Sequence, residues 1–190
     1  ARGPGRAAVT VRYMGQVAAV PVTVPFGPPT EFDWPANNFI DAQLAAEWRK
    51  LGLKPGAPSS DAEFLRRVSL DLAGTLPTPD EVRKFDADRD PKKRVKAIDA
   101  LLERPAYAEY WSLKWSDLLR AHRKLLGEKG LAAFNAWLRQ SLRDNRPLDK
   151  FVRELLTSQG NLYTSGPVAF YYVDKVPDDL AETTSQVFLG

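Results

Sequence analysis

Residues 60–82 have the sequence SDAEFLRRVSLDLAGTLPTPDEV, and no other part of the chain specifies its local structure so tightly. Ser60 and Glu63 stand three residues apart, which is the spacing of the reciprocal capping box that begins a helix. Apolar residues then recur at helical intervals until Gly74, a residue type that commonly ends helices. The first part of this stretch therefore predicts one well-bounded helix.

The second part of the stretch predicts another helix. Thr78 and Glu81 repeat the capping box, and Pro79 occupies the first helical position, where its missing N–H group is not needed. Further along, Asp90-Pro91 is predicted to begin a third helix in the same way.

The pattern stays helical on both sides of this region. A stripe that ends near Gly52 precedes it, and Pro105, Pro147 and Gly160 bound two of the later stripes. Gly127 and Gly130 are predicted to bracket a turn, and Asp178 or Asp179 is predicted to cap a last helix. The longest of these stripes is made by Tyr107, Trp111, Trp115, Leu118 and His122.

The N-terminal part of the chain has a different pattern. Residues 7–25 alternate between apolar and other side chains in two runs, which predicts a β-hairpin. An isolated hairpin is marginal in water, so it either packs on the helices or closes a truncated β-sandwich, and we favour the sandwich. The predicted fold is therefore mainly α, a multi-helix bundle with a short N-terminal hairpin as a β-sandwich remnant.

This pattern divides the chain into three predicted regions. Residues 1–27 are the closing strands, residues 28–36 a proline-rich linker, and residues 37–190 a helical domain that is truncated at its C-terminal end. The last helix retains an apolar face near Gly190, so we expect either self-association or dependence on residues beyond it.

The composition excludes several classes of function. The 190 residues include no cysteine, so this chain has no thiolate nucleophile, zinc–thiolate site or covalent haem attachment. The net charge is only +3, with both signs interleaved, which does not indicate a nucleic-acid partner. No apolar run is long enough to insert directly into a membrane.

Several segments carry a family resemblance. Residues 60–82, together with KKRVKAIDALLERPAYAEYWSLKWSDLLR at 92–120, FVRELLTSQG at 151–160 and DDLAETTSQVFLG at 178–190, resemble a domain of unknown function of exported planctomycete proteins with cytochrome-like sequences. The preceding AAVTVRYMGQVAAVPVTVPFG resembles the last strands of a bacterial group-2 immunoglobulin-like domain.

The resemblance implies an exported location, at the periplasm or cell surface, and partners that are other domains of the same protein or other proteins. It also implies a haem-attachment motif beyond Gly190 in the full-length protein, so no cofactor is expected within these residues. The first functional hypothesis is a non-catalytic scaffold or interaction module joined to a cytochrome-like region. The alternatives are part of an extracellular polysaccharide-acting hydrolase or lyase, and a redox or haem protein.

Four residues are weak candidates for catalysis: Asp71, Asp117, Glu109 and His122. Two nearby carboxylates can perform acid–base chemistry on a glycoside. The structural interpretation is favoured, in which Arg67 pairs with Asp71 and Asp117 with Arg120. His122 is interpreted as a side chain near a helix C-terminus, where positive charge is tolerated.

Other candidates concern metals and binding surfaces. Asp86, Asp88 and Asp90 match the first half of a calcium loop, but Pro91 and Ala97 stand where that loop needs glycine and glutamate, so a solvated turn is favoured. Aromatic residues make two further candidate features. Trp111 and Trp115 are predicted to lie in the core, and Tyr163, Phe170, Tyr171 and Tyr172 are the candidates for an exposed binding surface.

Overall fold

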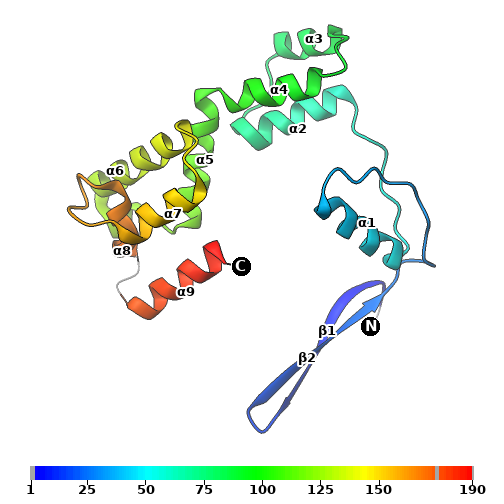
Figure 1. The fold of residues 1–190 in the computed structure, drawn as a ribbon, viewed down its shortest axis with the longest axis horizontal. Coiled ribbons are helices and arrows are strands. Elements are labelled where there is room, and N and C mark those ends of the chain that lie inside the picture. Colours follow the sequence, from blue (N-terminus) through cyan, green and yellow to red (C-terminus); the bar gives the residue numbers. More distant parts are fainter. Residues whose placement is uncertain (1–2, 174–175, 190) are drawn as a thin grey trace. The chain divides into compact units, whose positions relative to one another are not determined.

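The computed structural model describes residues 3–173 and 176–189, and these are mainly helical with one N-terminal hairpin (Figure 1). The prediction of a mainly α fold is confirmed. The chain divides into two compact units, residues 1–58 and residues 59–190. Within the described ranges, no helix has the length and apolar character needed to cross a membrane.

The hairpin consists of β1 (Gly5–Tyr13) and β2 (Gln16–Val24), which pair antiparallel. Met14 and Gly15 form the turn with φ values of 45° and 78°, the left-handed conformation that two-residue hairpin turns require. Residues directly opposite one another share a face, so the register builds one face from apolar side chains. The large ones on that face, Val9, Val11, Tyr13, Val20 and Val22, are all exposed.

Helix α1 (Phe39–Leu51) completes the first unit. The Asn38 side chain caps its first turn by accepting two backbone N–H groups. Gly52 ends the helix with φ 69°, as predicted. A side chain cannot replace this glycine without a clash, because a Cβ there would lie 2.5 Å from the carbonyl oxygen of Gly27.

The linker before α1 is held by aromatic side chains. Trp34 meets Trp48 edge to face with ring centroids 5.4 Å apart. The guanidinium of Arg49 lies over the ring of Phe32, 4.7 Å from its centroid, and donates a hydrogen bond to the Phe32 carbonyl oxygen. The segment is therefore irregular but packed.

The second unit begins with α2 (Asp61–Ala73), α3 (Pro79–Ala87) and α4 (Lys93–Leu102). Both predicted caps are present, although only one is reciprocal. Ser60 accepts the Glu63 N–H, but the Glu63 carboxylate turns to Arg67 instead of back to the cap. Thr78 and Glu81 form the complete capping box.

Replacing Thr78 by alanine is expected to lower the free energy of unfolding by about 1 kcal/mol, because the Glu81 N–H loses its acceptor. The measurement is urea unfolding of the chain. Thr164→Ala, in an exposed loop, is the matched control. Equal effects of the two substitutions would show that the cap is not what stabilises α3.

The predicted start of the third helix is wrong by a few residues. Helix α4 begins at Lys93, and its N-cap Lys92 makes no side-chain capping bond. Asp90 instead accepts the Lys92 N–H at 2.7 Å, which builds a turn before the helix. The Asp90 side chain therefore stabilises a turn that contains Pro91, and the helix begins after that turn.

An ion cluster ties the start of α2 to α4. Asp61 pairs with Lys93 at 2.6 Å and with Arg94 at 2.8 Å. Hydrogen bonds from Lys93 and then from Arg94 hold the pKa of Asp61 below its ordinary value. A lowered pKa in the folded state means that the ionised carboxylate stabilises the fold.

This cluster predicts a pH dependence of stability. An aspartate in an unfolded chain has a pKa of about 3.9, so the contribution of Asp61 is present above about pH 4 and is lost as the pH falls through its lower folded value. Urea unfolding at neutral and at acidic pH should show a smaller acid-induced loss of stability in Asp61→Asn than in the unchanged chain. Identical pH profiles would contradict the role given to this cluster.

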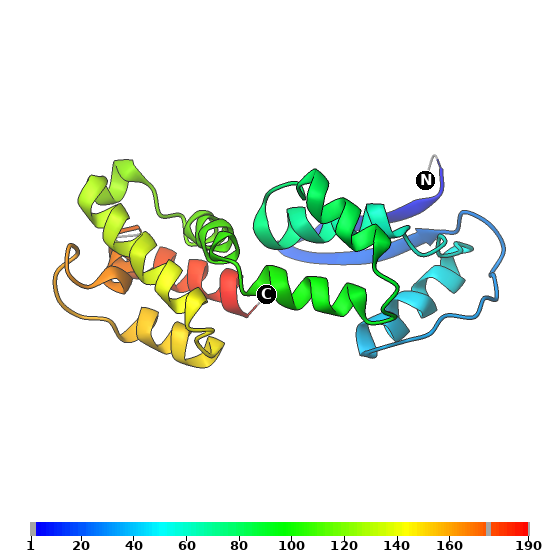
Figure 2. The ribbon, with the colours of Figure 1, turned by 90° about the horizontal axis from the view of Figure 1, so that it is seen from above.

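The rest of the second unit is helical. Its elements are α5 (Pro105–Leu118), α6 (Arg123–Arg143), α7 (Leu148–Thr157), the 3₁₀ turn η1 (Gly166–Ala169), α8 (Phe170–Val173) and α9 (Pro177–Phe188). Figure 2 looks nearly along the axis of α5, with α2–α4 on one side of it and α6–α8 on the other. Helix α5 therefore joins the two halves of this unit.

Some predicted boundaries in this region are wrong. Gly130 does not end a turn but lies buried within α6, against Leu162, whereas Gly127 does interrupt the helix with φ 66°. Helix α7 ends at Thr157, before Gly160. Asp178 and Asp179 lie in the first turn of α9 and do not cap it.

The core of the second unit lies between α6, α7 and the η1–α8 segment. Aromatic rings stack within it: the ring centroid of Trp137 lies 4.7 Å from that of Phe151 and 5.7 Å from that of Phe134. Val187 and Phe188 of α9 pack against this core, so the apolar face of the last helix is partly covered. The expected dependence on residues beyond Gly190 lies outside the described residues. The fully buried large side chains are Leu119, Phe134, Leu138, Leu155 and Phe170.

Candidate functional site

The two aspartates considered for acid–base chemistry lie on different helices. Asp71 is in the last turn of α2 and Asp117 is at the C-terminal end of α5, and both are exposed. Arg67 pairs with Glu63 at 2.6 Å and not with Asp71. A glutamate on the N-terminal side of a basic residue is the preferred i, i+4 arrangement, which explains that choice.

The end of α5 is fixed by Arg120, which adopts φ 57° and so stops the helix. Its backbone N–H donates to the carbonyl oxygen of Asp117 at 2.9 Å. Its guanidinium donates to the buried Thr183 hydroxyl at 3.4 Å. Arg120 therefore connects the end of α5 to α9.

The position predicted for His122 is wrong. Because Arg120 breaks the helix, His122 stands at the N-cap of α6 and not near the C-terminus of α5. Its side chain is exposed and makes no capping hydrogen bond.

The two tryptophans of α5 differ in surroundings. Trp115 lies against the core, with its ring 5.2 Å from that of Phe151 and 6.3 Å from that of Phe188. Trp111 is half-buried beside Tyr107 and Tyr110. Neither ring is presented as a flat exposed platform.

The aspartates at 86, 88 and 90 organise a turn. Asp88 accepts the Asp90 N–H, and Asp90 pairs with Lys96 at 2.5 Å. The hydrogen bond from Lys96 lowers the pKa of Asp90, and the same contact raises the pKa of Lys96. Asp86 is exposed. Among residues 3–173 and 176–189, no group of three or more acidic, histidine or cysteine side chains could hold a metal ion.

The aromatic segment after α7 is only partly a surface. Tyr163, Tyr171 and Tyr172 are exposed, but Phe170 is completely buried, so its assignment to a binding surface is wrong. Phe170 opens α8 and points into the core, whereas the hydroxyl of Tyr171 donates to the carbonyl oxygen of Leu156.

Glu109 is the one candidate acid that lies in a constellation of charged groups. From α5 it accepts hydrogen bonds from Arg139 at 3.3 Å and Arg143 at 3.1 Å, two residues one turn apart on α6. The helices approach closely because small side chains face α6 from α5. These are Ala108, Ser112 and Ser116, all buried.

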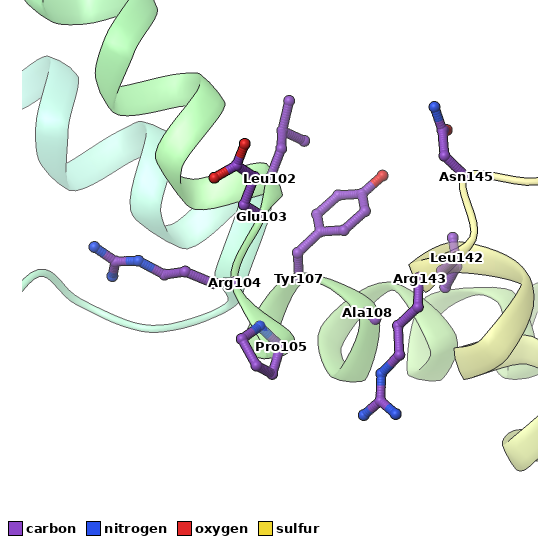
Figure 3. A pocket seen from close by; sticks show the side chains of 9 residues that line it. All are labelled: Leu102, Glu103, Arg104, Pro105, Tyr107, Ala108, Leu142, Arg143 and Asn145. Atoms are coloured by element: carbon purple, nitrogen blue, oxygen red, sulfur yellow. The ribbon is translucent and has the colours of Figure 1, made fainter.

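Two hollows flank this cluster. The first, which we call the Tyr107 hollow, has a volume of about 550 Å³ and lies where the end of α4, the start of α5 and the end of α6 meet. Figure 3 shows the Tyr107 ring projecting between Leu102 and Asn145. Of the Glu109 cluster, Arg143 lines this hollow.

The second, the Asn135 hollow, has a volume of about 530 Å³. It lies between the end of α2, α5 and α6, and Glu109 and Arg139 contribute to its wall. Asn135 also lines it, and its buried side-chain oxygen has no hydrogen-bond partner among the described residues. Neither Asp71 nor Asp117 lines either hollow.

The sequence contained part of the signal for this site. The repeat of small residues at 108, 112 and 116 indicates a close helix contact, and Arg139 and Arg143 form a basic stripe at helical spacing. The sequence alone does not show that Glu109, about 30 residues before Arg139, faces that stripe.

Replacing Glu109 by glutamine is expected to lower the free energy of unfolding by about 0.5–1 kcal/mol, since the paired side chains are 38–50% exposed and water screens their interaction. Urea unfolding measures this. The control is Glu128→Gln, whose pair with Arg123 is much more exposed and should contribute nothing measurable. A larger loss in the control would contradict the α5–α6 assignment.

Comparison with known proteins gives a family match. The model of the family described as PSCyt2, protein of unknown function (DUF1549), matches residues 39–190. Neither the curated proteins nor the solved structures include a match to this chain.

Proposed function

Because this chain belongs to the PSCyt2 family of proteins of unknown function, we propose its role from its own geometry: a non-catalytic helical interaction module of a larger exported protein. The observation that carries this proposal is the separation of the candidate catalytic residues. Asp71, Asp117 and His122 are exposed and lie on three different elements. Glu109 is bound by two arginines.

Glycoside hydrolysis requires two carboxyl groups about 5–9.5 Å apart across one bond. Its general acid must also have a raised pKa, which burial in apolar surroundings provides. Glu109 instead pairs with Arg139 and Arg143 and is half exposed to water, so it lacks those apolar surroundings. The geometry therefore favours binding and architecture over acid–base catalysis.

The hairpin supports the interaction part of this proposal. Its face of Val9, Val11, Tyr13, Val20 and Val22 is exposed on a two-stranded sheet, which is marginal by itself. We propose that further β strands of the native protein cover this face, in the manner of an immunoglobulin-like sandwich. The module would then connect that domain to a cytochrome-like region.

The test is a turnover assay with soluble neutral and acidic polysaccharides, in which the chain is incubated with each and new reducing ends are counted. We expect no release above the blank. The alternative function, a polysaccharide-acting hydrolase or lyase, requires release that falls in Glu109→Gln or Asp117→Asn, and that result would overturn the proposal.

A further inference from the structure

The packing of α5 on α6 leaves a surface with excess positive charge, which we call the Arg139 surface. It consists of Glu109, Tyr110, Leu113 and Lys114 of α5 and Arg139 and Arg143 of α6. The two arginines share the Glu109 carboxylate. Lys114 lies over the Tyr110 ring, 5.3 Å from its centroid. Three positive side chains are therefore balanced by one carboxylate, and among the described residues no other carboxylate pairs with them.

The two guanidinium groups retain donors for a second anion. Each guanidinium has five N–H groups. Arg139 donates one of them to a Glu109 oxygen at 3.3 Å, and Arg143 donates one to the other oxygen at 3.1 Å. The side chains of Arg139 and Arg143 are 38% and 50% exposed, so a ligand in solution can reach them.

The two arginines also repel each other. Residues four apart on a helix are neighbours, and like charges at that spacing destabilise the helix. The Glu109 carboxylate offsets only one of the two charges. A ligand that brings a second negative charge would offset the other one, whereas a neutral ligand would not. The surface therefore favours an anionic ligand.

An apolar side chain lies beside these charges. Leu113 is 62% exposed and lines the Asn135 hollow together with Tyr110 and Arg139. Arginine and tyrosine are enriched in protein–protein interfaces, where the centre of the contact is apolar. A nucleic acid would need a more extensive basic face, and the net charge of the whole chain is only +3. These features fit an acidic protein segment better than a polyanion without apolar side chains.

We propose that the Arg139 surface docks an acidic helical segment of a partner protein. The carboxylates of that segment pair with Arg139 and Arg143 while one of its apolar side chains covers Leu113. Carboxylates one helical turn apart match the spacing of the two arginines. This inference rests on the proposed function and deepens it, because it gives the interaction module the chemistry of its partner.

The test is isothermal titration of the chain with three probes. The first is an alanine-based helical peptide with two glutamates one helical turn apart and a leucine on the same face. The second is the same peptide with glutamine in place of both glutamates, and the third is hexagalacturonate, an acidic sugar. The acidic peptide should bind at millimolar concentration and more weakly as salt is raised. The glutamine peptide should bind about fivefold more weakly than the acidic one.

Two variants should change the affinity for the acidic peptide in opposite directions. Arg143→Gln removes one cation and should weaken binding about fivefold. Glu109→Gln removes the competing carboxylate and should tighten binding by about the same factor, although it lowers stability. A purely structural role of Glu109 would not give a tighter complex. The matched control is Arg153→Gln, which removes an exposed arginine of α7 outside this surface and should change the affinity by less than about twofold.

Four results would overturn the inference. The acidic peptide does not bind at millimolar concentration, Glu109→Gln binds it no more tightly than the unchanged chain, Arg143→Gln has the same effect as Arg153→Gln, or hexagalacturonate binds more tightly than the peptide. Each of these leaves the non-catalytic part of the proposed function standing, because the turnover assay decides that part.

Discussion

Replacing Phe134 by alanine is expected to lower the free energy of unfolding by about 3–5 kcal/mol, the range typical of removing a buried aromatic ring. The ring has no exposed surface, and it stacks on Trp137 with ring centroids 5.7 Å apart and planes 23° apart. Its removal loses the transfer free energy of the ring and leaves a cavity in the middle of the second unit.

The measurement is chemical denaturation followed by tryptophan fluorescence, since Trp115 and Trp137 both lie against this core. Leu148→Ala is the control, because Leu148 is 60% exposed at the start of α7 and should change stability by no more than about 0.5 kcal/mol. Losses of similar size in the two variants would show that the core is not centred on Phe134.

Replacing Gly166 by alanine is expected to destabilise the second unit by about 1–3 kcal/mol through overpacking. A Cβ at this position would lie 2.5 Å from the Cβ of Trp137 and 2.7 Å from the carbonyl oxygen of Ala133. Both atoms are held by α6, so η1 would have to move away from that helix. Thermal unfolding of the variant measures the cost.

Gly130→Ala provides a matched comparison, since Gly130 is buried like Gly166 but lies within α6. Its Cβ would lie 2.9 Å from the Cγ and one Cδ of Leu162, a side chain that can shift more easily than the α6 backbone, and alanine gains about 1 kcal/mol of helix propensity over glycine. The two contributions should nearly cancel. If Gly130→Ala were the more damaging change, the close contact between η1 and α6 would not be the constraint on Gly166.

The sequence predicts those parts of the fold whose cause is local. The Thr78–Glu81 capping box, Pro105 at the start of α5 and the glycine stops at 52 and 74 each depend on neighbours within four residues. These are the interactions that periodicity and capping rules describe. The hairpin is predictable for the same reason.

The errors arise where distant contacts decide. Arg120 adopts a left-handed conformation that glycine would normally supply, and this ends α5 early and moves His122 to a helix N-terminus. Glycine is a residue type typical of turns, but Gly130 lies within α6, where its lack of a side chain leaves room for Leu162. The sequence places Phe170 in an irregular segment, which suggests an exposed loop residue, but in the structure its side chain is buried in the core.

The candidate site could not be predicted from local sequence patterns, because contacts between distant residues build it. Glu109 was identifiable only as an acidic residue, because its partners Arg139 and Arg143 are brought to it by the packing of α5 on α6. The incomplete hydrogen bonding of Asn135 is likewise visible only once the surrounding side chains are in place.

Amide hydrogen exchange of the chain, measured residue by residue, tests the central claim most directly. A helical core with an uncovered β-hairpin predicts the strongest protection in α6 around Phe134 and Leu138, and the weakest among the regular elements in β1 and β2. Protection of the hairpin amides equal to that of α6 would contradict the account, because it would mean that the valine face is already buried within these residues.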